Sequence, residues 1–434
     1  MRKLDNVLKW VVQGQNFVNA YQRVRQNNGA PGVDGLSVED MKQYLPKHWN
    51  EVKGKILDGT YQPMPVRSVK IPKASGGERQ LGIPTVLDRI IQQSIHQLLS
   101  PHWEKQFSAY SYGFRPRRSA ADALQQATQY INQGWQWIID LDLKSFFDKV
   151  DHDKLMLLIS KEVKDKGLLR LIRKYLQTDM EQDGNIIKRL KGTPQGGPLS
   201  PLLSNILLNE LDKELERRGH RFIRYADDCS VFLGSQRAAQ RVLASITRFL
   251  ENKLLLEVNE KKTKICRPVK FTLLGHGFVS TYKKGEKGKY RLCITKASWK
   301  ELKRKIKIIT RKTSPIPLEE RIKRLNYLMR GWLNYFKNAT GQEKLKYLDS
   351  WIRCRLRYCI WKAWKKPKRR IRAFIQLGIS RSWAIRFGYS RMGGWAIACS
   401  PIMGTTITEA RLRRKGYIPF LEYYHSIRKD KIKN

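Results

Sequence analysis

The chain contains 434 residues, of which 85 are Lys or Arg and 38 are Asp or Glu, so its formal net charge is +47. This length predicts two or three domains, and a content of 41% hydrophobic residues excludes a disordered protein. A charge this large favours a polyanionic partner, with nucleic acid as the first candidate. An anionic membrane is the competing candidate, but the sequence has no stretch of about 18 apolar residues, so no membrane partner is expected.

Cysteine and histidine usage argues against a zinc module. The six cysteines include no Cys-x-x-Cys pair, and they lie at positions 229, 266, 293, 354, 359 and 399. This spacing also argues against a secreted disulfide framework. Because the N-terminal residues do not lead into a signal-peptide core, we expect a soluble, intracellular protein.

The first two thirds of the chain indicate an α+β fold. Residues 4–25 are predicted to be helical with an interruption near Gly14, and a loop rich in turn residues follows at 27–35. From about residue 60 to residue 290, short strand-like runs alternate with helices. Within that region 199–219 is predicted as one amphipathic helix, with Gly219 in the position of a C-terminal cap.

Two acidic clusters adjoin strand-like runs. In the first, residues 137–142 predict a strand from which Asp140 and Asp142 project on the same face, because side chains alternate along a strand. In the second, Asp227 and Asp228 lie in the run 221–233, between two apolar stretches that are typical of two strands joined by a tight turn.

The Asp227–Asp228 pair has two interpretations. Two adjacent negative charges on a hairpin turn are costly unless a cation neutralises them, and such oxygen ligands suit Mg²⁺, which keeps open positions for substrate phosphates. This interpretation predicts phosphoryl transfer with two metal ions about 3.5–4 Å apart, for which the neighbouring acidic strand would supply a bridging carboxylate. An acidic turn on a solvated hairpin is the alternative, and the pair alone does not exclude it.

The composition changes after residue 293. Residues 294–434 contain 36 Lys and Arg and 8 Asp and Glu, which gives +28 in a third of the chain. Helices are predicted there at 300–312, 318–336 and 348–364, and their short links suggest a small bundle. The tail from Pro367 is again basic and aromatic. Most tryptophans of this part are expected in the bundle core first, although they also suit nucleic-acid binding: Trp332, Trp351, Trp361, Trp364 and Trp395.

Several motifs occur in order along the chain. They are KASGGERQLGIPT at 73–85, SYGFRP at 111–116, Asp142 followed five positions later by Phe147, GTPQGGPLSP at 192–201, YADD at 225–228, VNEKKT at 258–263 and LG at 274–275. This series resembles the sequence blocks of group II intron reverse transcriptases, also called intron maturases, and the resemblance covers nearly the whole chain. It is most similar to the compact bacterial type in which no endonuclease domain follows.

The resemblance implies a right-hand polymerase, an α+β fold with fingers and palm, followed by an α-helical thumb (the X domain) and a small basic C-terminal domain. The expected limits are 1–60 for the N-terminal extension and the start of the fingers, 61–290 for fingers and palm, 291–366 for the thumb and 367–434 for a DNA-binding region. The implied activity is RNA-directed DNA synthesis that copies intron RNA into cDNA, together with help in splicing and mobility. The implied partners are group II intron RNA, an RNA template with a DNA primer, target DNA and deoxynucleoside triphosphates (dNTPs), in a bacterial cytoplasm or on the nucleoid.

The resemblance also assigns catalytic roles residue by residue. Asp142, Asp227 and Asp228 match the catalytic carboxylates and would hold two Mg²⁺ ions. Asp142 is preferred to Asp140 because the family motif places an aromatic residue five positions after its Asp, and Phe147 stands there.

A second group of residues matches the nucleotide site of the family. Lys73 and Arg79 match residues of the fingers that bind the triphosphate, and Gln195 matches a residue near the incoming nucleotide and the template. Phe147 matches the ring that selects deoxynucleotides by clashing with a 2′-hydroxyl. Arg115 lies in a family block, and both nucleotide binding and a structural role are compatible with its position.

Two alternatives to the polymerase stay open at this point. The chain could be an RNA-binding splicing factor, whose basic helices clamp a folded intron, or a domesticated reverse transcriptase that serves defence or repair. A purely RNA-binding descendant would be expected to lose catalytic carboxylates, so the presence of all three favours the polymerase. No Cys-pair cluster or His-Asn-His-like segment follows residue 367, so second-strand DNA cleavage is not expected.

Overall fold

The computed structural model describes residues 4–72, 77–282, 285–286 and 288–429. The chain forms two compact units, Met1–Phe271 and Thr272–Asn434. The division lies before the limit of 290 that was expected for the palm, because the strands that follow Phe271 pair among themselves. Among the helices of the described ranges, none is long and apolar enough to cross a membrane.

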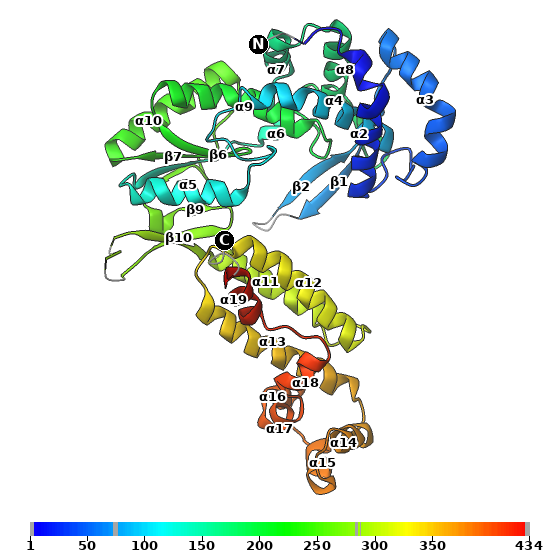
Figure 1. The fold of residues 1–434 in the computed structure, drawn as a ribbon, viewed down its shortest axis with the longest axis vertical. Helices are drawn as coiled ribbons and strands as arrows, with labels where there is room; N and C mark the ends of the chain where they lie inside the picture. The colour runs from blue at the N-terminus through cyan, green and yellow to red at the C-terminus, as the bar shows by residue number, and fades with distance from the viewer. Residues whose placement is uncertain (1–3, 73–76, 283–284, 287, 430–434) are drawn as a thin grey trace. The chain divides into compact units, whose positions relative to one another are not determined.

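The first unit combines two four-stranded sheets with the helices around them (Figure 1). Its strands are β1 (Val66–Pro72), β2 (Glu78–Ile83), β3 (Trp137–Leu141), β4 (Met180–Gln182), β5 (Asn185–Ile187), β6 (Arg221–Tyr225), β7 (Asp228–Leu233) and β8 (Lys264–Cys266). Its helices are α1 (Leu8–Val11), α2 (Gly14–Asn27), α3 (Met41–Asp58), α4 (Val86–Glu104), α5 (Ala120–Asn132), α6 (Phe146–Lys149), α7 (His152–Glu162), α8 (Lys166–Leu176), α9 (Ser200–Arg217) and α10 (Gln236–Phe249), with a π-helical turn at Leu250–Leu254 and a 3₁₀ turn at Pro268–Lys270.

The two sheets of this unit differ in burial. The first has the order β2-β1-β4-β5, and residues 70–72 of β1 and 78–80 of β2 are exposed. The second has the order β6-β7-β3-β8, and its central strand β3 is buried at Ile138 and Ile139. Helix α10 packs on β3, β7 and β8, while α5 and α9 pack on β6. Because helices cover the second sheet, β3 and β7 are apolar along most of their length.

The N-terminal helix is interrupted at Gly14 as predicted, but it begins later than predicted. Gly14 has a φ of 58° and separates α1 from α2. Residues before Leu8 are not helical because Leu4 bonds to another segment: its N–H donates to the carbonyl of Glu162 (2.9 Å), and its carbonyl accepts from the N–H of Lys164 (2.7 Å). The predicted helix at 199–219 is confirmed as α9, which ends before Gly219 with its φ of 70°.

The second unit begins with a small antiparallel sheet and continues as helices. The sheet has the order β11-β10-β9 and consists of β9 (Thr272–Leu273), β10 (His276–Ser280) and β11 (Tyr290–Ile294). The helices are α11 (Lys296–Ile309), α12 (Leu318–Phe336), α13 (Gln342–Ala363), α14 (Pro367–Gln376), α15 (Arg381–Gly388), α16 (Gly394–Cys399), α17 (Pro401–Thr406), α18 (Glu409–Arg414) and α19 (Phe420–Lys429).

The predicted bundle is present, and it has one more member than predicted. Helix α12 has the predicted limits, and it contacts both α11 and α13. The chain then returns from the tail, so that α19 packs on α12 and α13. Of the tryptophans expected first in a core, Trp361 is buried and Trp395 is exposed, while Trp332, Trp351 and Trp364 are half-buried.

One buried carboxylate attaches α19 to α13. Asp349 accepts hydrogen bonds from the backbone N–H groups of Phe420 (2.7 Å) and Leu421 (2.9 Å) and from the hydroxyl of Tyr417 (3.1 Å). Because the first N–H groups of a helix have no partner within the helix, Asp349 acts as the cap of α19 from a distant part of the chain.

We expect Asp349→Ala to destabilise the second unit by about 2–4 kcal/mol, because it leaves two buried donors and one partly buried donor without an acceptor. Urea unfolding of the full chain measures the loss, and limited proteolysis reports the release of α19. Glu343→Ala, at an exposed position of the same helix, is the matched control. Equal cleavage rates at α19 in the two variants would contradict the capping role.

Candidate active site

The two acidic clusters meet at one end of the second sheet. Tyr225 pairs with Asp228 across the β6–β7 hairpin, so Ala226 and Asp227 form its two-residue turn. Strand β7 pairs on its other side with β3, where Leu141 lies opposite Cys229. One further residue along this antiparallel register brings Asp142 beside Asp228. The sheet therefore brings together the carboxylates that were predicted from separate segments.

The carboxylates crowd one another electrostatically. Burial, followed by the negative charges of Asp227, Asp140 and Asp142, raises the pKa of Asp228 to about 6. Burial also raises the pKa of Asp140, although the ammonium of Lys264, 3.3 Å away, opposes the shift. Asp228 nevertheless keeps an exposed surface, so solvent screens part of this effect and the raised pKa is not a measure of stability.

The motif at 258–263 fixes the position of Asp142. The side-chain amide of Asn259 donates to Asp142 Oδ1 (2.8 Å), and the ammonium of Lys262 lies 3.4 Å from Oδ2. The backbone is held as well, because the N–H of Asn259 donates to the carbonyl of Asp142 (2.8 Å) and Asp142 donates its own N–H to Thr263 Oγ1 (3.2 Å). Sequence reasoning recognised this motif but gave Asn259 and Thr263 no role.

The donor set fits hard divalent cations. Carboxylate oxygens are the ligands that Mg²⁺ takes from proteins, and Mg²⁺ needs only one or two of them because waters and substrate phosphates complete its shell. Within the described ranges, no group of three or more His, Cys, Asp or Glu side chains is gathered closely enough to hold an ion. An ion at this site would take the rest of its ligands from water and substrate phosphates.

A glycine-rich loop at 192–197 contacts both the segment that follows β3 of the second sheet and β2 of the first sheet. The N–H of Thr193 donates to the carbonyl of Phe147 (2.6 Å), and the N–H of Gly82, in β2, donates to the carbonyl of Gln195 (2.8 Å). Phe147 is half-buried and meets Phe146 edge to face. The loop therefore contacts Phe147 at Thr193 and contacts β2, the strand on which Arg79 is exposed, at Gln195.

Two glycines of this loop are required by close contacts. A Cβ at Gly192, whose φ is 89°, would lie 2.6 Å from the carbonyl oxygen of Phe147. A Cβ at Gly196, whose φ is 133°, would lie 2.6 Å from the carbonyl oxygen of Gly82. Both positions thus combine a left-handed backbone with no room for a side chain.

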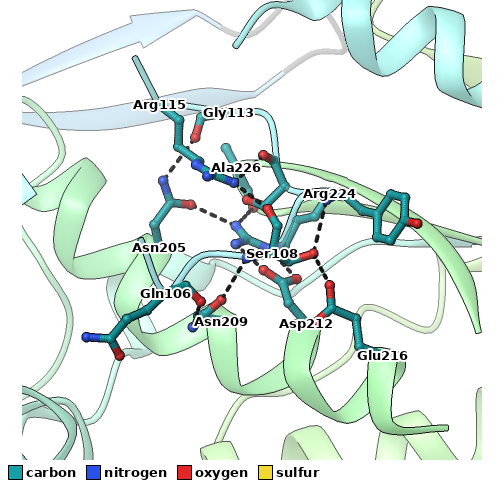
Figure 2. A network of polar contacts seen from close by, with 12 residues as sticks. Gln106, Ser108, Gly113, Arg115, Asn205, Asn209, Asp212, Glu216, Arg224 and Ala226 are labelled. Atoms are coloured by element: carbon teal, nitrogen blue, oxygen red, sulfur yellow. Dashed lines mark hydrogen bonds and ion pairs between the residues drawn. The ribbon is translucent and has the colours of Figure 1, made fainter. Parts of the chain in front are cut away.

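Of the two remaining predicted nucleotide-site residues, Arg115 is the one that the described residues include. Lys73 lies outside the described residues. Arg115 is buried, and its guanidinium donates to the carbonyl of Ser108 (Figure 2), to the carbonyl of Ser111 and to the carboxylate of Glu104. With these groups occupied inside the protein, the structure favours the structural alternative for Arg115 over nucleotide binding.

Comparison with known proteins defines the class. Residues 71–278 match the family described as reverse transcriptase (RNA-dependent DNA polymerase), and residues 299–375 match the group II intron maturase-specific domain. The chain is therefore an RNA-directed DNA polymerase that carries a maturase domain, with an α+β polymerase fold followed by a helical region. Reverse transcriptases generally use divalent metal ions, and proteins of this class bind RNA.

Individual relatives specify the family. Protein YkfC of Escherichia coli is 31% identical over 334 residues, which cover 68% of this chain and 87% of YkfC. The group II intron-encoded protein LtrA of Lactococcus lactis is 30% identical over 338 residues, 61% of this chain and 55% of LtrA. The putative COX1/OXI3 intron 2 protein of Saccharomyces cerevisiae is 32% identical over 216 residues, 49% of this chain and 25% of that protein. The chain belongs to the family of group II intron reverse transcriptases and maturases, and it spans about half of LtrA.

We expect Gly192→Ala to reduce primer extension by about 10- to 100-fold, because the added methyl group displaces the loop from Phe147 and misplaces the groups around it. Gly184→Ala is the matched control: Gly184 also has a positive φ (82°), but no atom of the described residues lies within 4 Å of the position that its added methyl group would take. Steady-state extension of a DNA primer on an RNA template compares the two. Equal losses would show that backbone strain, rather than the contact with Phe147, limits the loop.

Proposed function

We propose that this chain copies RNA into DNA by a two-Mg²⁺ mechanism in which Asp142, Asp227 and Asp228 are the metal ligands. The observation that supports the proposal is the meeting of these carboxylates at one end of a buried sheet, where burial and then the neighbouring negative charges raise the pKa of Asp228 to about 6. Such crowding is costly in the absence of a cation, and it suits a site that binds its metal together with the substrate phosphates.

Each part of the site would have a separate task. When bound, the two ions would activate the primer 3′-hydroxyl and stabilise the leaving pyrophosphate. Asn259 would keep Asp142 oriented through its 2.8 Å hydrogen bond. Arg79 would contact the oxygens of the triphosphate, a task that suits the planar fork of a guanidinium. Lys73 is proposed for the same task on the basis of the sequence motif alone.

Selection of the sugar is proposed for Phe147. Phe147 lies five residues after Asp142, shortly after β3. Its carbonyl accepts from the N–H of Thr193, so its backbone is fixed to the glycine-rich loop. A rigid ring selects deoxynucleotides by excluding the 2′-hydroxyl rather than by attracting the correct sugar. Gln195, in the neighbouring loop, would contact the incoming nucleotide or the template.

The second unit is proposed to bind group II intron RNA and target DNA. It carries most of the positive charge, and it exposes aromatic rings beside basic residues: Trp383, Tyr389 and Trp395 are exposed, and the guanidinium of Arg386 lies 5.2 Å from the ring of Trp383. Phosphates are bound by such cations, and unstacked bases by such rings. The maturase-domain match at 299–375 supports assistance in splicing by the same unit. Binding to DNA on the nucleoid is part of this proposal.

We expect Asp227→Ala to abolish Mg²⁺-dependent extension of a DNA primer on an RNA template while RNA affinity stays within about twofold, because one charge is small beside +47. Glu251→Ala makes the same charge change at an exposed position of the first unit and serves as the control. Extension by Asp227→Ala at the wild-type rate would refute the metal site. No extension by the wild type, with tight RNA binding, would instead favour a splicing factor without polymerase activity.

We expect Phe147→Ala to raise the incorporation of ribonucleotides relative to deoxynucleotides by about tenfold, since it removes the group that excludes the 2′-hydroxyl. Competition between the two nucleotides in single-nucleotide extension measures the ratio. Phe146→Leu, which changes the adjacent buried ring, should leave the ratio unchanged. An unchanged ratio in Phe147→Ala would remove Phe147 from the proposal.

A further inference from the structure

A buried ion pair lies behind the turn that carries Asp227 and Asp228. Arg224, in β6, donates from Nε to Asp212 Oδ1 (2.8 Å) and from Nη2 to Asp212 Oδ2 (2.6 Å), as Figure 2 shows. Both side chains are fully buried. Removing two charges from water is expensive, and a pair of apolar side chains of similar size is often at least as stable. The pair therefore calls for an explanation other than stability.

The third nitrogen of Arg224 reaches the turn itself. Its Nη1 donates to the carbonyl oxygen of Ala226 (3.0 Å) and to Asn205 Oδ1 (2.8 Å). Ala226 precedes Asp227 directly, and it has a φ of 59°, a left-handed conformation that is unfavourable for a residue with a Cβ. A residue in such a conformation persists only when its surroundings determine it. The bond from Arg224 is one of the contacts that do so.

A second contact acts on Ala226 from the other side. Gly113 lies so close that a Cβ added to it would be 2.2 Å from the backbone nitrogen of Ala226. The carbonyl of Gly113 accepts from the side-chain amide of Asn205 (2.9 Å), the same residue that accepts from Arg224. The N–H of Tyr112 also donates to the carbonyl of Arg224 (2.8 Å). Ala226 is thus enclosed between Arg224 and the segment 110–113.

Helix α9 supplies the fixed side of this arrangement. Asn205, Asn209, Asp212 and Glu216 recur at helical spacing along it, and all of them bond outside the helix. Asn209 and Glu216 bond to Ser108, on the segment that leads to Gly113 (Figure 2). The same helix therefore positions both the strand before the turn and the segment that packs against it.

We propose that Arg224 is a positioning residue: its guanidinium, fixed by Asp212 and Asn205, holds the carbonyl of Ala226 and thereby sets the position of Asp227 and Asp228. The inference rests on the proposed function of the two carboxylates. It assigns no contact between Arg224 and substrate. This positioning role explains why a charged pair lies in the interior, why Ala226 is held in a left-handed conformation and why position 113 is a glycine.

The test removes the pair without leaving a buried charge. In the double variant Arg224→Met with Asp212→Leu, we expect a melting temperature within about 3 °C of the wild type, because apolar replacement of a buried pair is often neutral. We expect kcat to fall by about 10- to 100-fold with a smaller change in KM for dNTPs, since the ligands are displaced while the nucleotide site is kept. Without nucleotide, the dissociation constant for Mn²⁺, followed by electron paramagnetic resonance, should rise about tenfold.

Controls separate positioning from folding and from the site assignment. Arg218→Met removes a partly buried guanidinium that bonds to Glu214 and Ser245 at the end of α9, and it should leave kcat unchanged. A folded double variant with wild-type kcat and Mn²⁺ affinity would overturn the proposal. If Asp227→Ala, measured alongside, keeps its polymerase activity, the assignment of the carboxylates is at fault and the positioning proposal falls with it.

A second variant decides the case in which the double variant does not fold. Arg224→Lys keeps the charge beside Asp212, but one ammonium cannot reproduce the planar fork that reaches Asp212, Asn205 and Ala226 together. We expect this variant to fold, to bind RNA as the wild type does and to show the same loss in kcat and in Mn²⁺ affinity. Wild-type values for both quantities would overturn the proposal.

Discussion

The first unit depends on holding several carboxylates at one end of a β-sheet against their mutual repulsion. Asp140, Asp142, Asp227 and Asp228 come from two segments of the chain, and the pairing of β3 with β7 is what brings them together. Backbone hydrogen bonds are well suited to this task, because they fix the positions of side chains without adding charge. Lys262 and Lys264 compensate part of the negative charge from the neighbouring segment.

Polar groups behind the site perform the complementary task of fixing the backbone. Helix α9 is apolar where it faces the core, yet it carries the buried amides of Asn205 and Asn209 and the buried carboxylate of Asp212, which bond to the segment 104–115 and to β6. Each of these groups has a partner, which is the condition under which buried polar networks stabilise one arrangement over others. These contacts explain two residues of the SYGFRP block at 111–116. Gly113 leaves room for the backbone of Ala226, and Arg115 bonds to Glu104, Ser108 and Ser111.

Sequence reasoning succeeded where a signal was local. The β6–β7 hairpin was predicted from two apolar stretches on either side of an acidic turn, and α9 and α12 were predicted from an apolar stripe, with a terminal glycine for α9; all of these signals lie in or next to the element itself. The acidic clusters were expected to meet because a two-metal site needs them together, and the register of β3 and β7 brings them together. Their metal-binding roles, like the limits of the four expected domains, remain predictions.

Features that depend on distant partners could not be predicted in this way. The burial of Arg115 follows from Glu104 and two carbonyls that only the folded segment provides, and the capping of α19 by Asp349 joins residues about 70 positions apart. Arg224 offered one clue, a charged residue within an otherwise buried strand, which requires a partner that the sequence does not identify.

The return of α19 to the bundle has a consequence for the order in which the second unit is completed. Helix α13 ends at Ala363 and α19 begins at Phe420, so about 56 residues are synthesised between them. At roughly 5–20 residues per second, the ribosome needs several seconds for this stretch. During that interval the apolar faces of α12 and α13 lack their last partner. The nascent chain is therefore at its most vulnerable to proteases and to misassembly after most of the second unit has already been synthesised.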